Sequence, residues 1–379
     1  MRSKKKWFSR PQVALLVGGA VLIISLLIFG TIRSFYTNIS TGSRRGPTPA
    51  PEQTEFGVLL MGYGGGSHEG TYLTDTIMAL HINTKTKQAV LVSVPRDTWV
   101  RIPADGGAAF YSKINAAYQM GLFPKNYPRL LDQFHGEQGA ADLIKGLLRT
   151  ITGIKTDYYL AIDFAGFHKA VDILGGLDIN VQKGFDDYEY PIEGKKDDTC
   201  GKDEAQFQEA LLIATDSPEL AFPCRFEHLH FEKGLTHMDG ETALKFVRSR
   251  HSAEDGGDFA RARRQQEFLA ALREKVLSIG FLPKIIPLMN ELDDHIRTDA
   301  PPELIQKFIG EAGSASQYRV TQVVLSTDNY LKNSVSADRQ YILISKQGQD
   351  VWTKLRGDIQ VLLQGGSLTP SPSAGVMKN

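Results

Sequence analysis

The residues best suited to chemistry lie between Gly234 and Gln266, a stretch that holds five arginines. Arg248 and Arg250 are two positions apart, so their side chains share a side only where the backbone is extended. The apolar spacing over 242–247 predicts a short helix, which places this Arg-Ser-Arg motif where a helix ends. The remaining three are Arg261, Arg263 and Arg264.

A second helix is predicted just beyond, and its apolar face turns polar at the N-terminal end. The apolar members are Phe268, Leu269, Leu272 and Val276, and the polar members are Arg261, Arg264 and Gln265. An inward guanidinium needs an anionic partner, because an unpaired buried charge costs several kcal/mol. Two interpretations stay open: an anion-binding site, or a solvated helix paired with Glu254, Asp255 and Asp258. Arg263 falls off this face, so we expect it to face solvent.

Composition limits the classes of protein to consider. A chain of 379 residues with 42% apolar content can bury a full core, in one large or two ordinary domains. Equal numbers of acidic and basic residues, 43 of each, argue against a general nucleic-acid-binding protein. Cys200 and Cys224 form no CxxC motif, which disfavours a zinc site, and a redox role lacks an activating partner. A disulfide between Cys200 and Cys224 is the remaining alternative if the compartment is oxidising.

The N-terminus predicts a membrane anchor. An uncharged run over residues 12–32 is long enough to span a bilayer, and basic residues concentrate in residues 1–11 before it. The positive-inside bias therefore places residues 1–11 in the cytoplasm and the folded part outside. A cleaved signal peptide is the alternative, with the folded part in the same compartment. Residues 33–55 are polar and contain proline, so we interpret them as a flexible tether.

Three apolar runs open the folded region, over 56–61, 75–82 and 89–94. They are nearly continuous, as in strands that are buried on both faces. A helical pattern over Phe164–Leu174 lies between two further strand-like segments, which predicts an α/β fold with helices covering both faces of a sheet.

Polar residues gather where these strands begin or end. Asp75 begins the second strand, Arg96 and Asp97 follow the third, and Lys113 and Asn115 stand at a predicted helix start. Singly, each is explained by a helix cap or a surface ion pair. Together with the arginines they form a set suited to holding a pyrophosphate with a divalent metal, since arginine offers forked donors and carboxylate a hard ligand.

A glycine-rich loop, GYGGGSHEGTYLT, joins the first two strands. It matches neither a Walker A loop nor GxGxxG, so it gives no support to a nucleotide site. It is either a flexible surface loop or a backbone that approaches a ligand closely.

Several motifs in a fixed order resemble the LytR-CpsA-Psr family. They are TDTIMAL, SVPRD, KINAAY, GGLDINV, HMDGETALKFVRSRH and DFARARRQQ. The resemblance implies a three-layer α/β/α domain over 56–365, with a central mixed sheet and an apolar pocket for a prenyl chain, preceded by one transmembrane helix. Members are membrane-anchored phosphotransferases that attach anionic glycopolymers, carried on polyprenyl pyrophosphate, to peptidoglycan. It therefore implies a single-pass cell-membrane protein whose partners are that lipid-linked polymer, peptidoglycan and membrane lipid.

The resemblance also implies roles for individual residues. Asp75 corresponds to the ligand of Mg²⁺ or Mn²⁺, and Arg96, Arg248 and Arg250 to the catalytic arginines at the pyrophosphate. The same site would be lined by Lys113, Arg261 and Gln265, and supported by Asp97, Asn115, Asp258 and Arg264.

Two departures from the family pattern stand out. Leu73 occupies a position where many members have arginine, and Tyr63 and Gly64 stand where a second carboxylate is common. In the glycine-rich loop, Glu69 is the candidate metal ligand that substitutes for it, with His68 as an alternative.

Residues 184–232 are longer and more acidic than the family needs, so we predict a surface insertion, with a Cys200–Cys224 disulfide as one option. Residues 366–379 are disordered by composition. Two other functions stay open beside phosphotransfer: a non-catalytic receptor for lipid pyrophosphates or anionic glycans, and a pyrophosphatase that uses water as acceptor.

Overall fold

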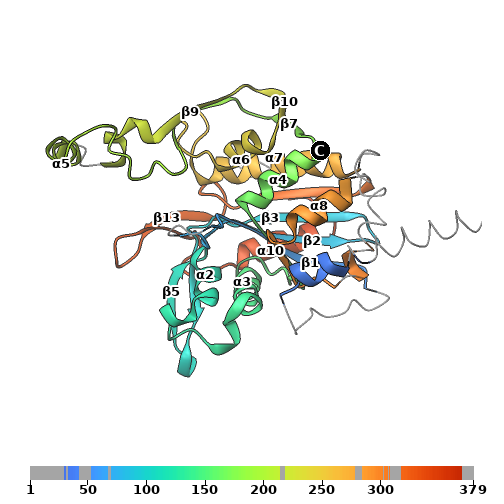
Figure 1. The fold of residues 1–379 in the computed structure, drawn as a ribbon. Helices are drawn as coiled ribbons and strands as arrows, with labels where there is room; N and C mark the ends of the chain where they lie inside the picture. Colours follow the sequence, from blue (N-terminus) through green and yellow to red (C-terminus); the bar gives the residue numbers. More distant parts are fainter. Residues whose placement is uncertain are drawn as a thin grey trace, which may run out of the picture.

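A six-stranded mixed sheet lies at the centre of the computed structural model (Figure 1). Its strand order is β11-β6-β1-β2-β3-β12, in which β6 runs parallel to β1 and β12 parallel to β3 while the other neighbours are antiparallel. The bounds are β1 Glu55–Tyr63, β2 Thr74–Asn83, β3 Gln88–Ser93, β6 Tyr158–Asp163, β11 Ile296–Thr298 and β12 Arg319–Val324. The predicted strands are all present, within two residues at each end.

The structure describes residues 30, 33–41, 53–66, 70–213, 218–277, 284–301, 303–305, 307 and 317–368. The transmembrane helix predicted over 12–32 lies outside these ranges, apart from residue 30, and so do residues 1–11 and most of the predicted tail. Within the ranges, every helix is too short or too polar to span a lipid bilayer.

The two faces of the sheet are packed differently. Leu59 pairs in register with Ala79 on β2 and Tyr159 on β6, and all three are fully buried in the larger core. This face is covered by α3 (Gly136–Thr152), which ends at left-handed Gly153, together with α2 (Ala116–Leu122) and α10 (Thr353–Leu363). Because side chains alternate along a strand, the next row must point to the opposite face.

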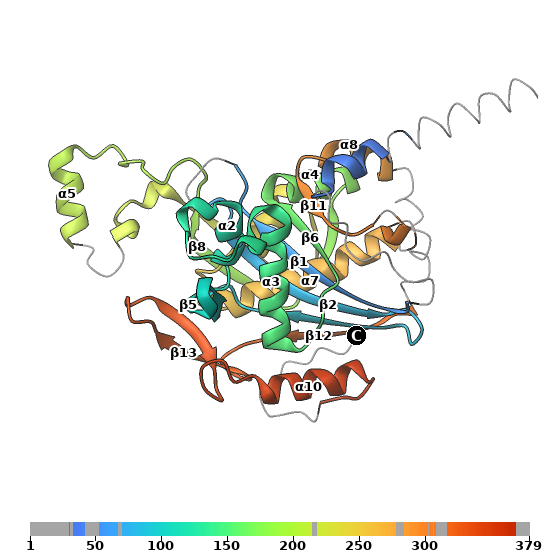
Figure 2. The ribbon, with the colours of Figure 1, turned by 90° about the horizontal axis from the view of Figure 1, so that it is seen from below.

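A second layer covers that opposite face, as Figure 2 shows in part. Its helices are α4 (Phe164–Leu174), α6 (Gly240–Arg248), α7 (Gly257–Leu277) and α8 (Ile285–Leu292). Two ribbons complete it, the first pairing β7 (Leu177–Val181) with β10 (Gly234–Met238) and the second pairing β8 (Phe185–Pro191) with β9 (Phe226–Phe231). This layer has its own hydrophobic core, and the α/β/α arrangement that we expected is present.

Two further ribbons lie outside the main sheet. They pair β4 (Trp99–Pro103) with β5 (Ala109–Lys113), and β13 (Leu331–Val335) with β14 (Tyr341–Ser345). Neither ribbon was assigned from the sequence. The second ribbon docks on the loop after β3, where the Leu343 N–H donates to the Asp97 carbonyl at 3.0 Å.

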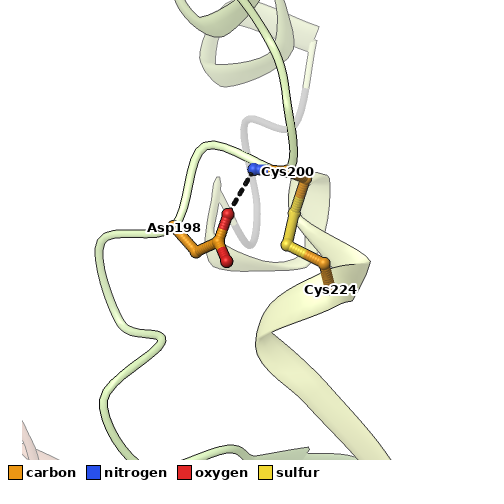
Figure 3. Close-up of side chains that lie close together, drawn as sticks. All are labelled: Asp198, Cys200 and Cys224. Atoms are coloured by element: carbon orange, nitrogen blue, oxygen red, sulfur yellow. Dashed lines mark hydrogen bonds between the residues drawn. A yellow bond between two sulfur atoms is a disulfide. The ribbon is translucent and has the colours of Figure 1, made fainter.

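The surface insertion predicted over 184–232 is narrower than expected. Its two ends are β8 and β9, whose apolar residues Phe185 and Phe231 belong to the second core. Of its described residues, 192–213 and 218–225, the arm, project from the body and carry α5 (Glu204–Ile213) far from the sheet in both views (Figures 1 and 2). Cys200 and Cys224 are joined in a disulfide within the arm, and the Asp198 carboxylate accepts a hydrogen bond from the Cys200 N–H (Figure 3).

The tether predicted over 33–55 does not begin at residue 33. Residues 33–39 are helical, and Ile39 is buried, because an apolar side chain there gains more from packing than from solvent. Ser40 bridges to Thr298 on β11, and the Tyr159 hydroxyl donates to Thr41 Oγ1 at 2.8 Å. The segment that leaves the predicted anchor is therefore fixed to the domain.

The unequal packing of the two faces predicts unequal losses of stability. Leu59→Ala should lower the free energy of unfolding by about 2–5 kcal/mol, because the side chain is fully buried and leaves a cavity. Leu160→Ala, from the opposite face and 39% exposed, should cost less than about 1 kcal/mol. Urea unfolding of both variants measures the difference, and equal losses would contradict the assignment of the two faces.

Candidate functional site

A cavity of about 270 Å³ separates the sheet from the second layer. Its sheet wall is the row opposite to Leu59, in which Met78, Leu60 and Leu160 are neighbours across three strands. Its helical wall is also apolar and includes Phe164, Phe167, Leu244, Phe268, Leu269 and Leu272. A contiguous apolar wall that the fold leaves uncovered is typical of a ligand-binding site.

One end of this cavity is charged, and most of the predicted site residues meet there. Asp75, the second residue of β2, accepts a hydrogen bond from Arg96 Nη1 at 2.6 Å, and Arg261 Nη1 lies 3.9 Å from the same Oδ1. Burial by itself would raise the pKa of Asp75, but Arg261 and Arg96 outweigh it and lower the pKa below its ordinary value. The carboxylate is therefore ionised at neutral pH.

Asp258, in the first turn of α7, is the centre of the charged end. Its Oδ1 lies 2.9 Å from Arg261 Nη2, 3.8 Å from Arg250 Nη1 and 3.9 Å from Arg96 Nε. This oxygen is buried, and it has no well-aligned hydrogen-bond donor among the described residues. Asp258 was predicted only to orient the arginines, but it stands among them as a second acidic group.

The cluster carries an excess of positive charge. Arg96, Arg248, Arg250 and Arg261 contribute four positive charges and Asp75 and Asp258 two negative ones, which leaves two positive charges. Burial, together with repulsion from neighbouring arginines, lowers the pKa of Arg250 and lowers that of Arg261 to about 10. Each guanidinium stays charged at neutral pH, and an entering anion would relieve their repulsion.

Lys113 and Asp97 support the charged end from the sheet side. The Lys113 ammonium donates to Asp97 Oδ1 at 2.6 Å, and Asp97 Oδ2 lies 3.5 Å from Arg96 Nε. Burial would raise the pKa of Asp97, but the Lys113 hydrogen bond and Arg96 hold it below its usual value. Asn115, just before α2, acts through its backbone, because its carbonyl accepts from the Thr74 N–H at 3.1 Å. Asn115 therefore holds the start of β2, and Asp97 holds Arg96 and Lys113 together just after β3.

Arg248 stands at the junction between the apolar and charged parts of the cavity. It is the last residue of α6, as the Arg-Ser-Arg pattern predicted, and the backbone leaves the helical conformation at Ser249 (φ −52°, ψ 140°). Its guanidinium lies over the Phe164 ring at 4.2 Å and donates to the Tyr190 hydroxyl at 3.3 Å. An arginine held on an aromatic face stays available for an anion.

Arg264 was predicted to support the anion site, but the structure buries it away from the cavity. It is 1% exposed and binds the main chain that carries the other arginines: its Nε donates to the Phe246 carbonyl at 2.9 Å, and an Nη donates to the Ser249 carbonyl. Asp255 accepts from Arg264 Nη1 twice, through its main-chain carbonyl at 2.8 Å and its carboxylate at 2.9 Å. Helical spacing alone could not separate this position from Arg261, because both lie on the inward side of α7.

The expectation that Arg263 faces solvent was wrong. Its guanidinium is half-buried and pairs with Asp255, which Arg264 also binds. One buried carboxylate thus joins two consecutive arginines. Gln265, in contrast, lines the cavity as predicted, and its side-chain amide reaches the Val247 carbonyl at 3.4 Å.

Sequence reasoning missed Asp187, which lies at the base of the arm on β8. This fully buried carboxylate accepts from Ser249 Oγ at 2.5 Å and from the Arg250 and His251 N–H groups at 3.1 Å each. It therefore fixes the Arg-Ser-Arg turn. An aspartate in a strand with alternating apolar residues was the available signal, but it fell within the predicted insertion.

In its described part, the glycine-rich loop packs against the end of β6. At left-handed Gly65, a Cβ atom would lie 2.8 Å from the side chain of Asp163. Asp163 itself accepts from the Gly166 N–H and contacts His295, so it caps α4. Glu69 and His68, the candidate second metal ligands, lie outside the described residues.

Comparison with known proteins places these features in context. A model of the LytR_cpsA_psr family matches residues 36–357. The polyisoprenyl-teichoic acid–peptidoglycan teichoic acid transferase TagU of Enterococcus faecalis is 24% identical over 344 residues, covering 86% of this chain and 92% of that protein. Its counterpart TagV of Bacillus subtilis is 25% identical, and the match covers 70% of this chain and 55% of TagV. The B. subtilis TagV crystal structure aligns at a TM-score of 0.53 and 21% identity, over 84% of this chain and 100% of that chain, which shows a shared fold.

The two inward arginines of α7 should behave differently on truncation. Arg264→Ala should lower the free energy of unfolding by about 3–5 kcal/mol, because it leaves the Asp255 carboxylate and three main-chain carbonyls buried without this partner. Arg261→Ala should cost less, because it also removes repulsion with Arg96 and Arg250. Denaturant titrations test this, and a larger loss for Arg261→Ala would overturn the structural role of Arg264.

Asp187 predicts a pH-dependent contribution to stability. Burial would raise its pKa, but hydrogen bonds from Ser249 and three N–H groups lower it below the model-peptide value of about 3.9. Its stabilisation is therefore fully present above about pH 4 and is lost as the pH falls through the lowered pKa. Wild type should exceed Asp187→Asn by about 1–3 kcal/mol at pH 7, with the gap closing below pH ~4 in urea unfolding. A gap that widens with acid would contradict the assignment.

Proposed function

Since the chain belongs to the LytR_cpsA_psr family, we propose that it is a phosphotransferase that moves an anionic glycopolymer from a polyprenyl pyrophosphate carrier to peptidoglycan. The observation that carries the proposal is the continuity of one cavity from an apolar wall to an arginine cluster. A ligand that fits it has a long apolar part joined to a compact polyanion. The printed names of the TagU and TagV relatives describe transfer of a polyisoprenyl-linked polymer to peptidoglycan, which supports the same choice.

The apolar wall suits the prenyl chain. The row of Met78, Leu60 and Leu160 offers branched and flexible side chains on one side, and the tilted rings of Phe167 and Phe268 lie 4.5 Å apart between centres on the other. An isoprenoid chain in this position would remove both surfaces from water, which is worth roughly 25 cal/mol per Å² of apolar area. The prenyl chain would be bound equally tightly in the ground state and in the transition state, so this binding serves to position the pyrophosphate at the arginines.

The charged end suits the pyrophosphate. Arg96, Arg250 and Arg261 converge on Asp75 and Asp258, and Arg248 adds a fourth guanidinium at the boundary with the apolar wall. Charge builds up on the phosphoryl oxygens and the leaving group during transfer, so fixed guanidiniums stabilise the transition state without further reorganisation. These arginines are the catalytic residues of the proposal, with Lys113 holding the loop of Arg96 through Asp97.

Asp75 and Asp258 fit a divalent metal. Both are carboxylates in the arginine cluster, and Asp258 Oδ1 is buried without a well-aligned donor in the described part of the chain, so a hard oxygen ligand is available. We propose that these two residues hold Mg²⁺ or Mn²⁺, with Asp75 as the ligand expected from the family motif. A bound ion would neutralise charge on the phosphoryl oxygens.

In the proposed reaction, a hydroxyl of the acceptor sugar attacks the phosphorus on the glycan side of the pyrophosphate. The bond from that phosphorus to the bridging oxygen breaks, the hydroxyl proton is released, and polyprenyl phosphate leaves. Arg248 and Arg250 contact the pyrophosphate at the cavity, and the extended turn between them lets both guanidiniums reach it. Asp187 keeps that turn in place.

We also propose that residues 12–32 anchor the protein in the cell membrane, with residues 1–11 in the cytoplasm and the domain outside. The uncharged run and the basic residues before it support this orientation. The docking of residues 33–41 on β11 and Tyr159 would then hold the domain close to the bilayer, where its lipid substrate lies.

Removal of two catalytic arginines gives a direct test of the proposal. The double variant Arg248→Ala, Arg250→Ala should lose at least tenfold in transfer rate, because each charged interaction is worth about 1.5–3 kcal/mol and 1.36 kcal/mol is tenfold. The measurement is release of polyprenyl phosphate and labelling of peptidoglycan from a lipid-linked glycan in Mg²⁺. Arg149→Ala, an exposed arginine on α3 beyond the opposite face of the sheet, is the matched control and should keep the wild-type rate.

The same assay separates the alternatives. Lipid retained at one molecule per chain with no polyprenyl phosphate released would indicate a receptor. Polyprenyl phosphate released equally with and without peptidoglycan would indicate a pyrophosphatase. Unchanged transfer in the double variant would refute the role of the two arginines.

A further inference from the structure

His251 stands at the rim of the cavity, directly after Arg250 in the chain. Among the described residues that line the cavity, Leu160, Pro191 and His251 are exposed to solvent. Of these three, only His251 has a titratable side chain. The residue therefore borders both the inside of the cavity and the solvent, next to the arginine cluster.

A reaction with a polymeric acceptor has to take place at this rim. Peptidoglycan is too large to enter a cavity of about 270 Å³, so its hydroxyl must reach the phosphorus from outside. A group that takes the hydroxyl proton must then be accessible from outside as well. Imidazole is the side chain that most often serves in such proton transfers, from hydrogen-bond distance of the reacting group.

The hydrogen bond that the ring makes selects its tautomer. His251 Nδ1 lies 3.2 Å from the main-chain carbonyl oxygen of Glu189 on β8. Because a carbonyl oxygen can only accept, Nδ1 carries the hydrogen of the neutral imidazole and Nε2 carries the lone pair. In the described part of the chain, Nε2 has no hydrogen-bond partner. The basic nitrogen is therefore free to accept a proton.

The main chain of His251 is held together with that of a catalytic arginine. The His251 N–H and the Arg250 N–H both donate to Asp187 Oδ2, each at 3.1 Å. One carboxylate oxygen thus fixes the main chain at both positions. A proton acceptor and a charge-stabilising group that serve the same phosphorus need such a fixed geometry, because catalysis of this kind depends on positioning.

The other acidic and phenolic groups that line the cavity are engaged or keep their protons. Asp75 is paired with an arginine, Asp163 caps α4, and Asp187 is fully buried beneath the Arg-Ser-Arg turn. Burial raises the pKa of Tyr190, so its phenol stays protonated at neutral pH. Among the described lining residues, His251 is the remaining group with an available lone pair.

We propose that His251 is the general base of the phosphotransfer, an assignment that rests on the proposed function. Its Nε2 takes the proton of the acceptor hydroxyl as that oxygen forms a bond to the glycan-side phosphorus. The bond from this phosphorus to the bridging oxygen breaks, and polyprenyl phosphate leaves with the electron pair. The imidazolium then gives its proton to solvent, which reaches the exposed residue. Arg248 and Arg250 stabilise the charge on the phosphoryl oxygens meanwhile.

Steady-state kinetics of His251→Ala and His251→Gln in the full-length, detergent-solubilised protein test this role. Both variants remove the basic nitrogen and keep the main-chain bond to Asp187. In Mg²⁺, kcat for transfer from lipid-linked glycan to peptidoglycan should fall at least about a hundredfold, since a general base contributes roughly 10²–10⁴-fold. The KM for the lipid should stay unchanged, because the arginines remain. Added imidazole should restore kcat of His251→Ala in proportion to its concentration, because the position is open to solvent.

The matched control is His237→Ala, which removes another exposed imidazole beside a carboxylate, outside the cavity, and should keep wild-type kinetics. Circular dichroism and the unfolding temperature establish that each variant is folded. A wild-type kcat in either His251 variant, or a loss in His251→Ala that imidazole does not restore, would overturn the role of His251 and leave the proposed function standing. Absence of transfer by the wild-type protein would instead refute the proposed function itself.

Discussion

The position of the catalytic arginines depends on one buried guanidinium, that of Arg264. A helix leaves its last carbonyls without intrahelical donors, and at the end of α6 two of them are satisfied by side chains from α7: Arg264 binds the Phe246 carbonyl and Gln265 reaches that of Val247. Arg264 also holds the Ser249 carbonyl and Asp255, so the end of α6, the following loop and the start of α7 form one unit. Arg248, Arg250, Asp258 and Arg261 all belong to that unit.

The unit is held from a second direction by β8. Asp187 accepts the N–H groups of Arg250 and His251, which are left unpaired by the extended turn. An arginine and an aspartate thus bind the same short loop from opposite sides, one through carbonyls and the other through N–H groups. This arrangement satisfies the buried polar main chain, as the interior of a protein requires, and leaves the guanidiniums of Arg248 and Arg250 at the cavity.

Stability and binding are divided between the two faces of the sheet. The face that carries Leu59 and Tyr159 packs against α2, α3 and α10, and both side chains are fully buried there. The opposite row, with Leu60 and Leu160, lines the cavity, and its side chains stay partly exposed. The large core on the Leu59 face stabilises the domain, so the opposite face can keep an uncovered apolar wall for a ligand. The arm extends from the second core and does not enter the first.

The sequence by itself determined β1, β2, β3, α4 with the two strands that flank it, and the C-terminal end of α6, because hydrophobic periodicity is a local property that packing reinforced here. It also selected Asp75, Arg96, Arg248, Arg250 and Arg261, because together they form a set suited to a pyrophosphate and they stand in motifs that resemble the family. It could not separate Arg264 from Arg261, or detect the role of Asp187, because those roles depend on which main-chain groups lie opposite. Only the tertiary structure brings Ser249 within reach of both residues, and this contact between segments distant in sequence decides which charges bind the protein and which remain for a ligand.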